Sequence, residues 1–81
     1  MSNEEAKQAF LQQLPVVHNC HTSRSLIVYA RIKQYIHTIA DRKMSVSLAL
    51  TDEKERVLIF AAPSEVAIYD ENKPLERGNY F

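Results

Sequence analysis

The three histidines and the single cysteine are the residues of this chain best suited to chemistry. His18, Cys20 and His21 lie close together in the sequence, and His37 follows further along. Imidazole nitrogens and a thiolate are ligands that zinc prefers, usually four of them in a tetrahedron. However, the spacing matches no zinc motif, and the adjacent side chains of Cys20 and His21 are difficult to direct at one ion. We therefore predict that these residues pack and hydrogen-bond, and that the chain has no metal site.

Catalysis finds little support in the sequence. A Cys–His nucleophile pair needs an orienting acid and an oxyanion-binding element, and neither can be assigned here. The carboxylates fall at the start of the first helix, in turns and near the end of the chain, where exposure to solvent explains them. A single glycine also excludes the glycine-rich loops that bind nucleotides. We predict a protein that is not an enzyme, with no cofactor and no small-molecule substrate.

The composition indicates one small soluble domain. The chain has 81 residues, of which 46% are hydrophobic and 25% charged, so a single core can only just offset the entropy of folding. One cysteine allows no intrachain disulfide. The first residues, MSNEEAKQAF, lack the pattern of a secretory signal, and no apolar run is long enough to span a bilayer. We expect a cytoplasmic protein that does not enter a membrane.

An amphipathic helix is predicted near the N-terminus. Ser2 and Glu5 have the spacing of a capping box, which marks a helix start. Ala6, Phe10 and Leu14 then recur at steps of four residues and form one apolar stripe. The proline that follows Leu14 disfavours helical backbone before it. We therefore predict a helix over residues 3–13 that packs on the strands.

Residues 26–40 decide the fold. Even positions in this stretch are more apolar than odd ones, which predicts one long, half-buried strand with its even side chains facing the core. A helix is the alternative, since Val28, Ile32 and Ile36 also fall on one helical face. The polar Gln34 interrupts the apolar face, so we expect a bend or bulge there.

The remaining pattern predicts four more strands and a tail. Pro63 lacks an N–H for a ladder and begins a single helical turn before the last strand. The predicted fold is mostly β with an N-terminal helix, α+β, arranged as a small five-stranded SH3-like barrel, with an Sm-like order as the alternative. The predicted domain covers residues 1–69, with strands at about 15–18, 26–40, 44–51, 56–62 and 66–69, and a flexible tail at 70–81.

Four stretches carry a resemblance to a known group. The segments PVVH, YARIKQYI, VSLALTD and RVLIFAAPSEV, behind a short helix, resemble small uncharacterised proteins of phages and conjugative elements of Gram-positive bacteria. The resemblance covers about residues 4–69. It implies a mobile-element setting and a compact β fold, and it supplies no activity and no functional residues.

Binding to another protein, or to a second copy of the chain as a homodimer, is the predicted function. Small β folds without chemistry usually act through a surface or an edge strand. The odd side chains of the long strand should make an apolar patch with basic residues inside it, a composition typical of interface centres. The predicted partner-binding residues are Ile27, Tyr29, Tyr35 and Ile39.

Nucleic-acid binding is the alternative function. Residues 21–43 carry five basic residues and one acidic residue, although the formal net charge of the chain is zero. Basic side chains between aromatic ones can neutralise phosphates and stack on bases. The candidate residues are Arg24, Arg31, Lys33, Arg42 and Lys43, with Tyr29, Tyr35 and His37 among them.

Overall fold

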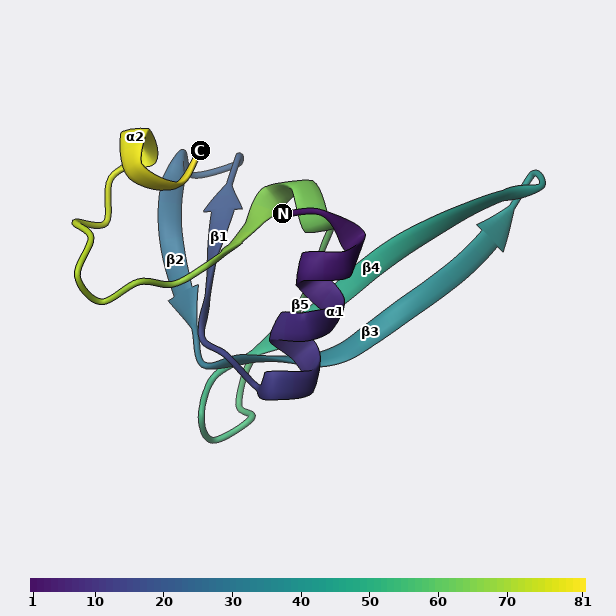
Figure 1. The fold of residues 1–81 in the computed structure, drawn as a ribbon, viewed down its shortest axis with the longest axis horizontal. Helices are drawn as coiled ribbons and strands as arrows, with labels where there is room; N and C mark the ends of the chain where they lie inside the picture. The colour runs from purple at the N-terminus through teal and green to yellow at the C-terminus, as the bar shows by residue number, and fades with distance from the viewer.

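The computed structural model describes residues 1–81 and shows a mostly β protein with one N-terminal helix (Figure 1). None of its helices is long and apolar enough to span a membrane. The elements, in chain order, are α1 (Asn3–Gln12), β1 (Val16–Cys20), β2 (Ser25–Tyr29), β3 (Arg31–Ala40), β4 (Lys43–Thr51), β5 (Leu58–Ala61), the 3-10 turn η1 (Pro63–Glu65), β6 (Val66–Ile68) and α2 (Arg77–Tyr80).

Helix α1 begins at the predicted capping box. The Ser2 hydroxyl accepts a hydrogen bond from the backbone N–H of Glu5 at 3.1 Å, and the Glu5 carboxylate accepts one from the N–H of Ser2 at 3.3 Å. The helix ends one residue earlier than predicted, at Gln12, because Gln13 has a left-handed backbone (φ 54°). Its small residues Ala6 and Ala9 are fully buried and let the helix approach the strands closely.

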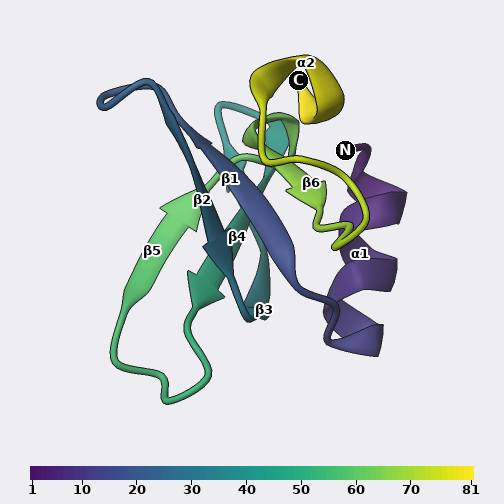
Figure 2. The same ribbon diagram turned by 90° about the vertical axis from the view of Figure 1, so that its left-hand side faces the viewer.

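The strands form two antiparallel sheets rather than the predicted barrel. One sheet has the order β2-β1-β6 and the other β3-β4-β5. The chain passes through η1 between β5 and β6, and no ladder of hydrogen bonds joins the two sheets, so neither an SH3-like nor an Sm-like barrel closes. In Figure 2, α1 stands on one side of the strands and β5 on the other.

The stretch predicted as one long strand is extended, and the helical alternative is wrong. It bends at Ala30, so that its first part, β2, pairs with β1 and its second part, β3, pairs with β4. The backbone N–H of Ala30 still donates to the carbonyl of Thr51 at 3.0 Å and holds the two sheets together at this corner. The predicted single strand therefore serves two sheets, which gives six strands in place of five.

A β-bulge within β3 reverses which side chains face the core. Ile32 pairs with Leu50, but after the bulge Tyr35 pairs with Leu48. Cross-strand partners share a face of the sheet, so the even position Ile32 and the odd position Tyr35 both face α1. The bulge lies between Ile32 and Gln34, where we predicted an irregularity. Our prediction that even positions face the core fails beyond it, and it also fails in β2, where the odd position Tyr29 packs against the core and the even position Val28 is 41% exposed.

The other boundaries differ by a few residues. β1 is longer than predicted because β2 pairs with it as far as Cys20, and β5 is shorter because only Leu58–Ala61 pair with β4. The single helical turn at Pro63 is present as η1. The segment 70–81 has more structure than the predicted flexible tail: it contains α2, and the Arg77 guanidinium donates to the Asn19 side-chain oxygen at 2.6 Å.

The hydrophobic core lies where α1 crosses the base of the β3–β4 hairpin and meets β1 and β6. Phe10 and Tyr35 pack at its edge, with ring centroids 6.4 Å apart. The eight buried residues of the core are Ala6, Ala9, Val16, Ile32, Leu48, Leu50, Ala61 and Val66.

The end of the β3–β4 hairpin extends away from this core. We call residues 37–46 the arm. All of its residues except Val46 are exposed, and Figure 1 shows it projecting from the body along the longest dimension of the molecule, which is 40 Å against 26 and 22 Å. The two-residue turn at its end, Asp41 and Arg42, has positive φ at both positions (51° and 64°), as in a type I′ hairpin.

The core and the arm can be compared by one substitution at two places on β3. Ile32→Val should lower the free energy of unfolding by about 0.5–1.5 kcal/mol, because Ile32 is fully buried and the lost methylene leaves a cavity. Ile39→Val should leave it unchanged within about 0.5 kcal/mol, because Ile39 lies exposed on the arm. Urea unfolding of the purified variants measures both, and equal losses at the two positions would contradict this division.

Candidate functional site

The four residues considered as metal ligands do not come together. His18 lies in β1, Cys20 at its end, His21 in the following turn and His37 on the arm. The structure contains no group of three or more His, Cys, Asp or Glu side chains placed to hold a metal ion.

His18 is a packed side chain. Only 12% of it is exposed, its ring lies 6.4 Å from that of Tyr29, and its Nε2 lies 3.5 Å from a carboxylate oxygen of Glu65. Its Nδ1 is buried without a hydrogen-bond partner. These contacts come from β1, β2 and η1, so His18 contributes to the junction between strands.

Cys20 lies beside the turn that joins β1 to β2. Hydrogen bonds from the Ser23 side chain and backbone lower the pKa of the Cys20 thiol below its ordinary value of 9.0, and the charge of Arg77 adds a smaller effect. The thiol is therefore more easily ionised than a free cysteine. No histidine pairs with it, so the geometry gives no nucleophilic dyad.

The predicted partner-binding residues do not form one patch. Ile27 and Tyr29 of β2 lie on the same face of the first sheet as their β1 partners, His18 and Val16. The Tyr29 ring packs against the core, and this burial raises the pKa of its phenol.

On the second sheet, Tyr35 packs on α1 and donates to the Asn3 carbonyl at 3.3 Å. The Ala30 bend and the bulge cause the separation, because they turn the odd positions to different surroundings. Of the four predicted residues, only Ile39 is freely exposed on the arm.

One face of the arm is apolar along its length. Ile39 pairs with Met44, and His37 pairs with Val46, on the same face as the buried Leu48. Ile39 is 77% exposed and Met44 63%. His37 packs edge-on against Tyr35 at 4.9 Å, and its Nδ1 lies 3.3 Å from the Met44 sulfur. We call Ile39, Met44 and His37 the arm face; it continues the core stripe beyond the end of α1.

Met44 was missed as a surface residue because its sequence pattern is that of a core strand. Met44, Val46, Leu48 and Leu50 alternate with small or polar residues and share one face of β4, and the last two are buried. Nothing in the alternation shows where the covering helix stops. A second exposed apolar pair is Leu58 and Phe60 on β5. Apolar residues occupy both faces of this strand, a pattern typical of a strand that is covered on both sides.

The basic residues proposed for nucleic-acid binding are dispersed. Arg31 and Lys33 both pair with Glu55, at 2.8 and 3.5 Å, and the hydrogen bond from Arg31 together with the charge of Lys33 lowers the pKa of Glu55. Arg24 lies in the β1–β2 turn of the first sheet, whereas the other four belong to the β3–β4 hairpin of the second. A continuous basic and aromatic face is therefore not formed.

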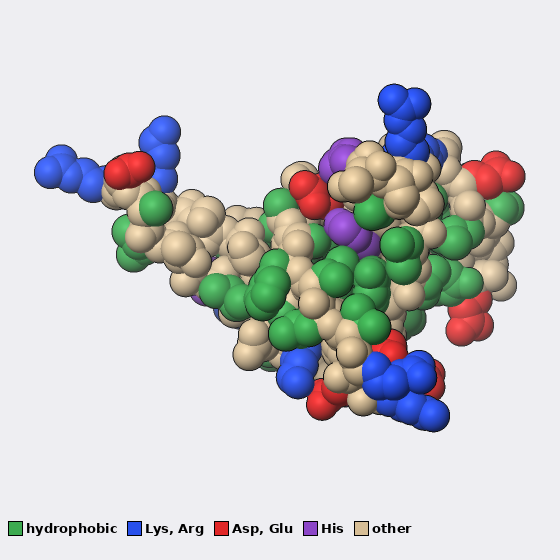
Figure 3. All heavy atoms as spheres, turned by 180° about the vertical axis from the view of Figure 1, so that it is seen from behind, with side chains coloured by type: hydrophobic (Ala, Val, Ile, Leu, Met, Phe, Trp, Pro, Cys, Tyr) green, Lys and Arg blue, Asp and Glu red, His purple; other side chains and the backbone are tan.

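Arg42 and Lys43 lie together at the end of the arm, and neither makes an ion pair within the chain. We call Asp41, Arg42 and Lys43 the tip. Figure 3 shows its Lys and Arg side chains at the far end of the molecule, with hydrophobic side chains directly behind them. The tip thus places exposed positive charges next to the arm face.

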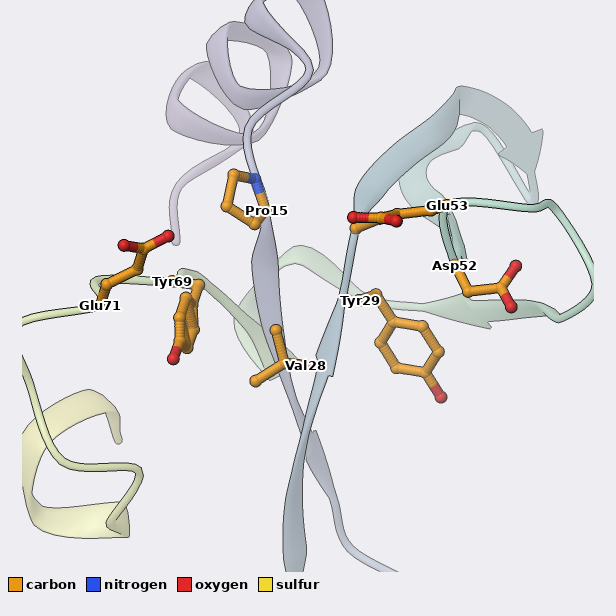
Figure 4. Close-up of a pocket in the computed structure, with 8 residues that line it drawn as sticks. Pro15, Val28, Tyr29, Asp52, Glu53, Tyr69 and Glu71 are labelled. Atoms are coloured by element: carbon orange, nitrogen blue, oxygen red, sulfur yellow. The ribbon is translucent and has the colours of Figure 1, made fainter.

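A shallow pocket of about 340 Å³ lies at the corner where β2 bends into β3. Figure 4 shows Glu53 and Glu71 on opposite sides of Pro15 and Val28, with the Tyr69 ring beside Val28. No basic residue lines the pocket. Its lining residues are Pro15, Val28, Tyr29, Ala30, Asp52, Glu53, Tyr69 and Glu71.

The three carboxylates of the pocket differ in their partners. Burial would raise the pKa of Asp52, but hydrogen bonds from the Arg56 backbone and guanidinium, at 2.7 and 2.9 Å, lower it below its ordinary value of 3.8. Asp52 is thus ionised and already paired. Glu53 and Glu71 have no ion pair within the chain, so the pocket has unbalanced negative charge.

The geometry offers two surfaces for recognition, the arm and the pocket, and no assembled catalytic group. Comparison with known protein families, curated proteins and solved structures finds no match. The physical chemistry of the arm and the pocket therefore carries the functional proposal.

The Cys20 environment can be tested by alkylation. Because hydrogen bonding favours the thiolate, iodoacetamide should react with Cys20 at lower pH than with a free cysteine. Ser23→Ala should move the midpoint of the rate–pH profile upward, toward 9.0, and slow the reaction at neutral pH. Thr22→Ala, next to it in the turn, keeps the side chain of Ser23 and serves as the control. An unchanged midpoint in Ser23→Ala would contradict the assigned hydrogen bond.

Proposed function

We propose that this protein is a non-catalytic protein-binding module and that the arm is its binding element. The observation that carries the proposal is the exposed pair Ile39 and Met44, which lies on the uncovered continuation of the core face. Fully burying two such side chains stabilises a complex by about 1.5–3 kcal/mol each. A partner that covers the arm face would bury its apolar side chains, as α1 buries those at the base of the hairpin.

The backbone of the arm supports the same proposal. β3 pairs only with β4, so its other edge is unpaired along the arm. An open strand edge with apolar side chains can take an additional strand from another chain. A two-stranded ribbon is also marginally stable by itself, so the arm gains order when a partner packs on it.

Self-association is the form of binding that we propose first. A second copy carries the same arm face, and an interface between identical surfaces is the commonest arrangement in small oligomers. A dimer would also increase the core available to a domain of 81 residues. The mobile-element setting implied by the resemblance and the cytoplasmic location remain predictions, and both are compatible with a partner from the host or from the element.

Replacing the apolar residues of the arm should abolish association. Ile39→Ser combined with Met44→Ser should weaken it at least about a hundredfold, because the interface loses two buried apolar side chains. Sedimentation equilibrium of the purified protein measures the effect, and circular dichroism shows that the fold is retained. Tyr35 is unsuitable for this test because it packs on α1.

The control for the arm face is Thr38→Ala with Ser45→Ala. These residues pair across the arm on its opposite face, and their replacement should leave association unchanged. A monomeric wild-type protein, or equal association of the Ile39/Met44 variant and the wild type, would count against the arm as a self-association element.

Nucleic-acid binding remains the alternative, now confined to the tip. Arg42 and Lys43 are unpaired at the end of a projecting two-stranded ribbon, a shape that enters DNA grooves in some proteins. Two cations and one neighbouring anion are few for this purpose, so we expect no binding of short oligonucleotides at low salt in a fluorescence anisotropy titration. Binding that weakens steeply with salt and disappears in Arg42→Ala with Lys43→Ala would favour the alternative.

A further inference from the structure

The pocket at the β2–β3 corner has the features of a site for a long cationic side chain. Its floor is apolar, with Pro15 and Val28, and its sides carry the unpaired carboxylates of Glu53 and Glu71 (Figure 4). Lysine and arginine have apolar stems and charged ends, so they can lie along an apolar floor and bring the charge to carboxylates at the rim. The Tyr69 ring adds a surface that attracts cations.

The chain itself supplies no cation to this pocket. Arg56, the nearest partner of Asp52, is bound in the β4–β5 loop through two hydrogen bonds. Arg31 and Lys33, both on β3, form ion pairs with Glu55 of the β4–β5 loop. The negative charge of Glu53 and Glu71 is therefore available to a group from outside the chain.

The tip of the arm has the complementary chemistry. Arg42 and Lys43 are exposed, adjacent and unpaired. Figure 1 shows the arm directed away from the body, whereas the pocket lies at the junction of the two sheets, so the tip does not reach the pocket of its own chain. A tip can enter a pocket only between two copies.

We infer that the pocket binds the basic tip of a second copy, so that the arm of one chain lies across the body of another. Arg42 and Lys43 bring their charges to Glu53 and Glu71, and their stems cover Pro15 and Val28. The inference rests on the proposed self-association and adds the surface that receives the arm. Two chains can exchange arms reciprocally and close a symmetric dimer, in which each tip occupies the partner's pocket.

Charge reversal at each surface tests this arrangement. Arg42→Glu with Lys43→Glu gives a negative tip and keeps the negative pocket, so association should weaken more than about tenfold. Glu53→Lys with Glu71→Lys gives a positive pocket and keeps the positive tip, and it should weaken association to a similar degree. Wild-type association should also weaken as salt is raised, because the pairs lie at an open surface.

Mixing the two variants gives the decisive measurement. The negative tip of one variant fits the positive pocket of the other, and the remaining tip and pocket keep their original signs. An equimolar mixture should therefore form a mixed complex by sedimentation velocity, although each variant alone is monomeric. Arg24→Glu with Lys7→Glu is the matched control: it makes the same change in net charge away from both surfaces, and one of its residues also lies at a positive φ.

The outcomes separate this inference from the arm proposal. A mixture that stays monomeric, or a control that weakens association as much as the tip variant, overturns the docking of tip and pocket. If the Ile39/Met44 variant does not associate while both charge-reversal variants associate like the wild type, the arm binds elsewhere and the pocket inference fails. Recovery in the mixture, together with full association of the Ile39/Met44 variant, would support the pocket and reject the arm face.

Discussion

Helix α1 is too short to cover the whole apolar face of the β3–β4 hairpin, and most features of this structure follow from that difference in length. α1 has ten residues and is about 15 Å long, whereas β3, also of ten residues, spans about 33 Å. The helix therefore covers the base of the β3–β4 hairpin, where Ile32, Leu48 and Leu50 are buried. The last turn of the helix lies at the base, where the Gln13 side chain donates to the Ile32 carbonyl, and the first turn lies toward the arm, where the Tyr35 hydroxyl donates to the Asn3 carbonyl. The same apolar stripe continues past the first turn of the helix, and its outer half has no cover within the chain.

This mismatch divides one hairpin into two parts with different roles. At the base, hydrophobic burial stabilises the fold, and Phe10 and Tyr35 close the edge of the core. Further out, the same residue types contribute little to the free energy of unfolding, because they are in water in the folded chain as they are in the unfolded chain. Covering such a surface with another molecule would remove its apolar side chains from water, which is the basis of the binding role proposed for the arm.

The sequence allowed several elements to be predicted, because their signals are local. The capping box at Ser2 and Glu5, the extended backbone of residues 26–40 and the turn at Pro63 all depend on neighbouring residues. The faces of β3 could not be predicted, since one extra residue in the bulge before Gln34 exchanges the inward and outward sets. The division into two sheets could not be predicted either, because it depends on the bend at Ala30, and no proline or glycine marks that bend in the sequence.

The candidate site shows the same limit. Ile39 is exposed as predicted, but it lies on the face that continues the core and not on the opposite face. Tyr35 and Tyr29 were assigned to the wrong surroundings, because one alternation was applied across a bend and a bulge. The exposure of Met44 and the grouping of Glu53 with Glu71 depend on where distant elements end, and a single sequence gives no signal for either. Residues that are distant in the sequence and become neighbours only in the tertiary structure can be identified only from that structure.

The turn at the end of the arm has a consequence for the way this domain balances stability. Left-handed backbone is unfavourable, by about 1–2 kcal/mol, for residues other than glycine, asparagine and aspartate, yet Arg42 adopts it beside Asp41 while the only glycine lies at position 78. An Asn-Gly pair would make a lower-energy hairpin. The domain thus tolerates a conformational penalty at the tip of the arm, and the residue that incurs it carries a guanidinium group into solvent.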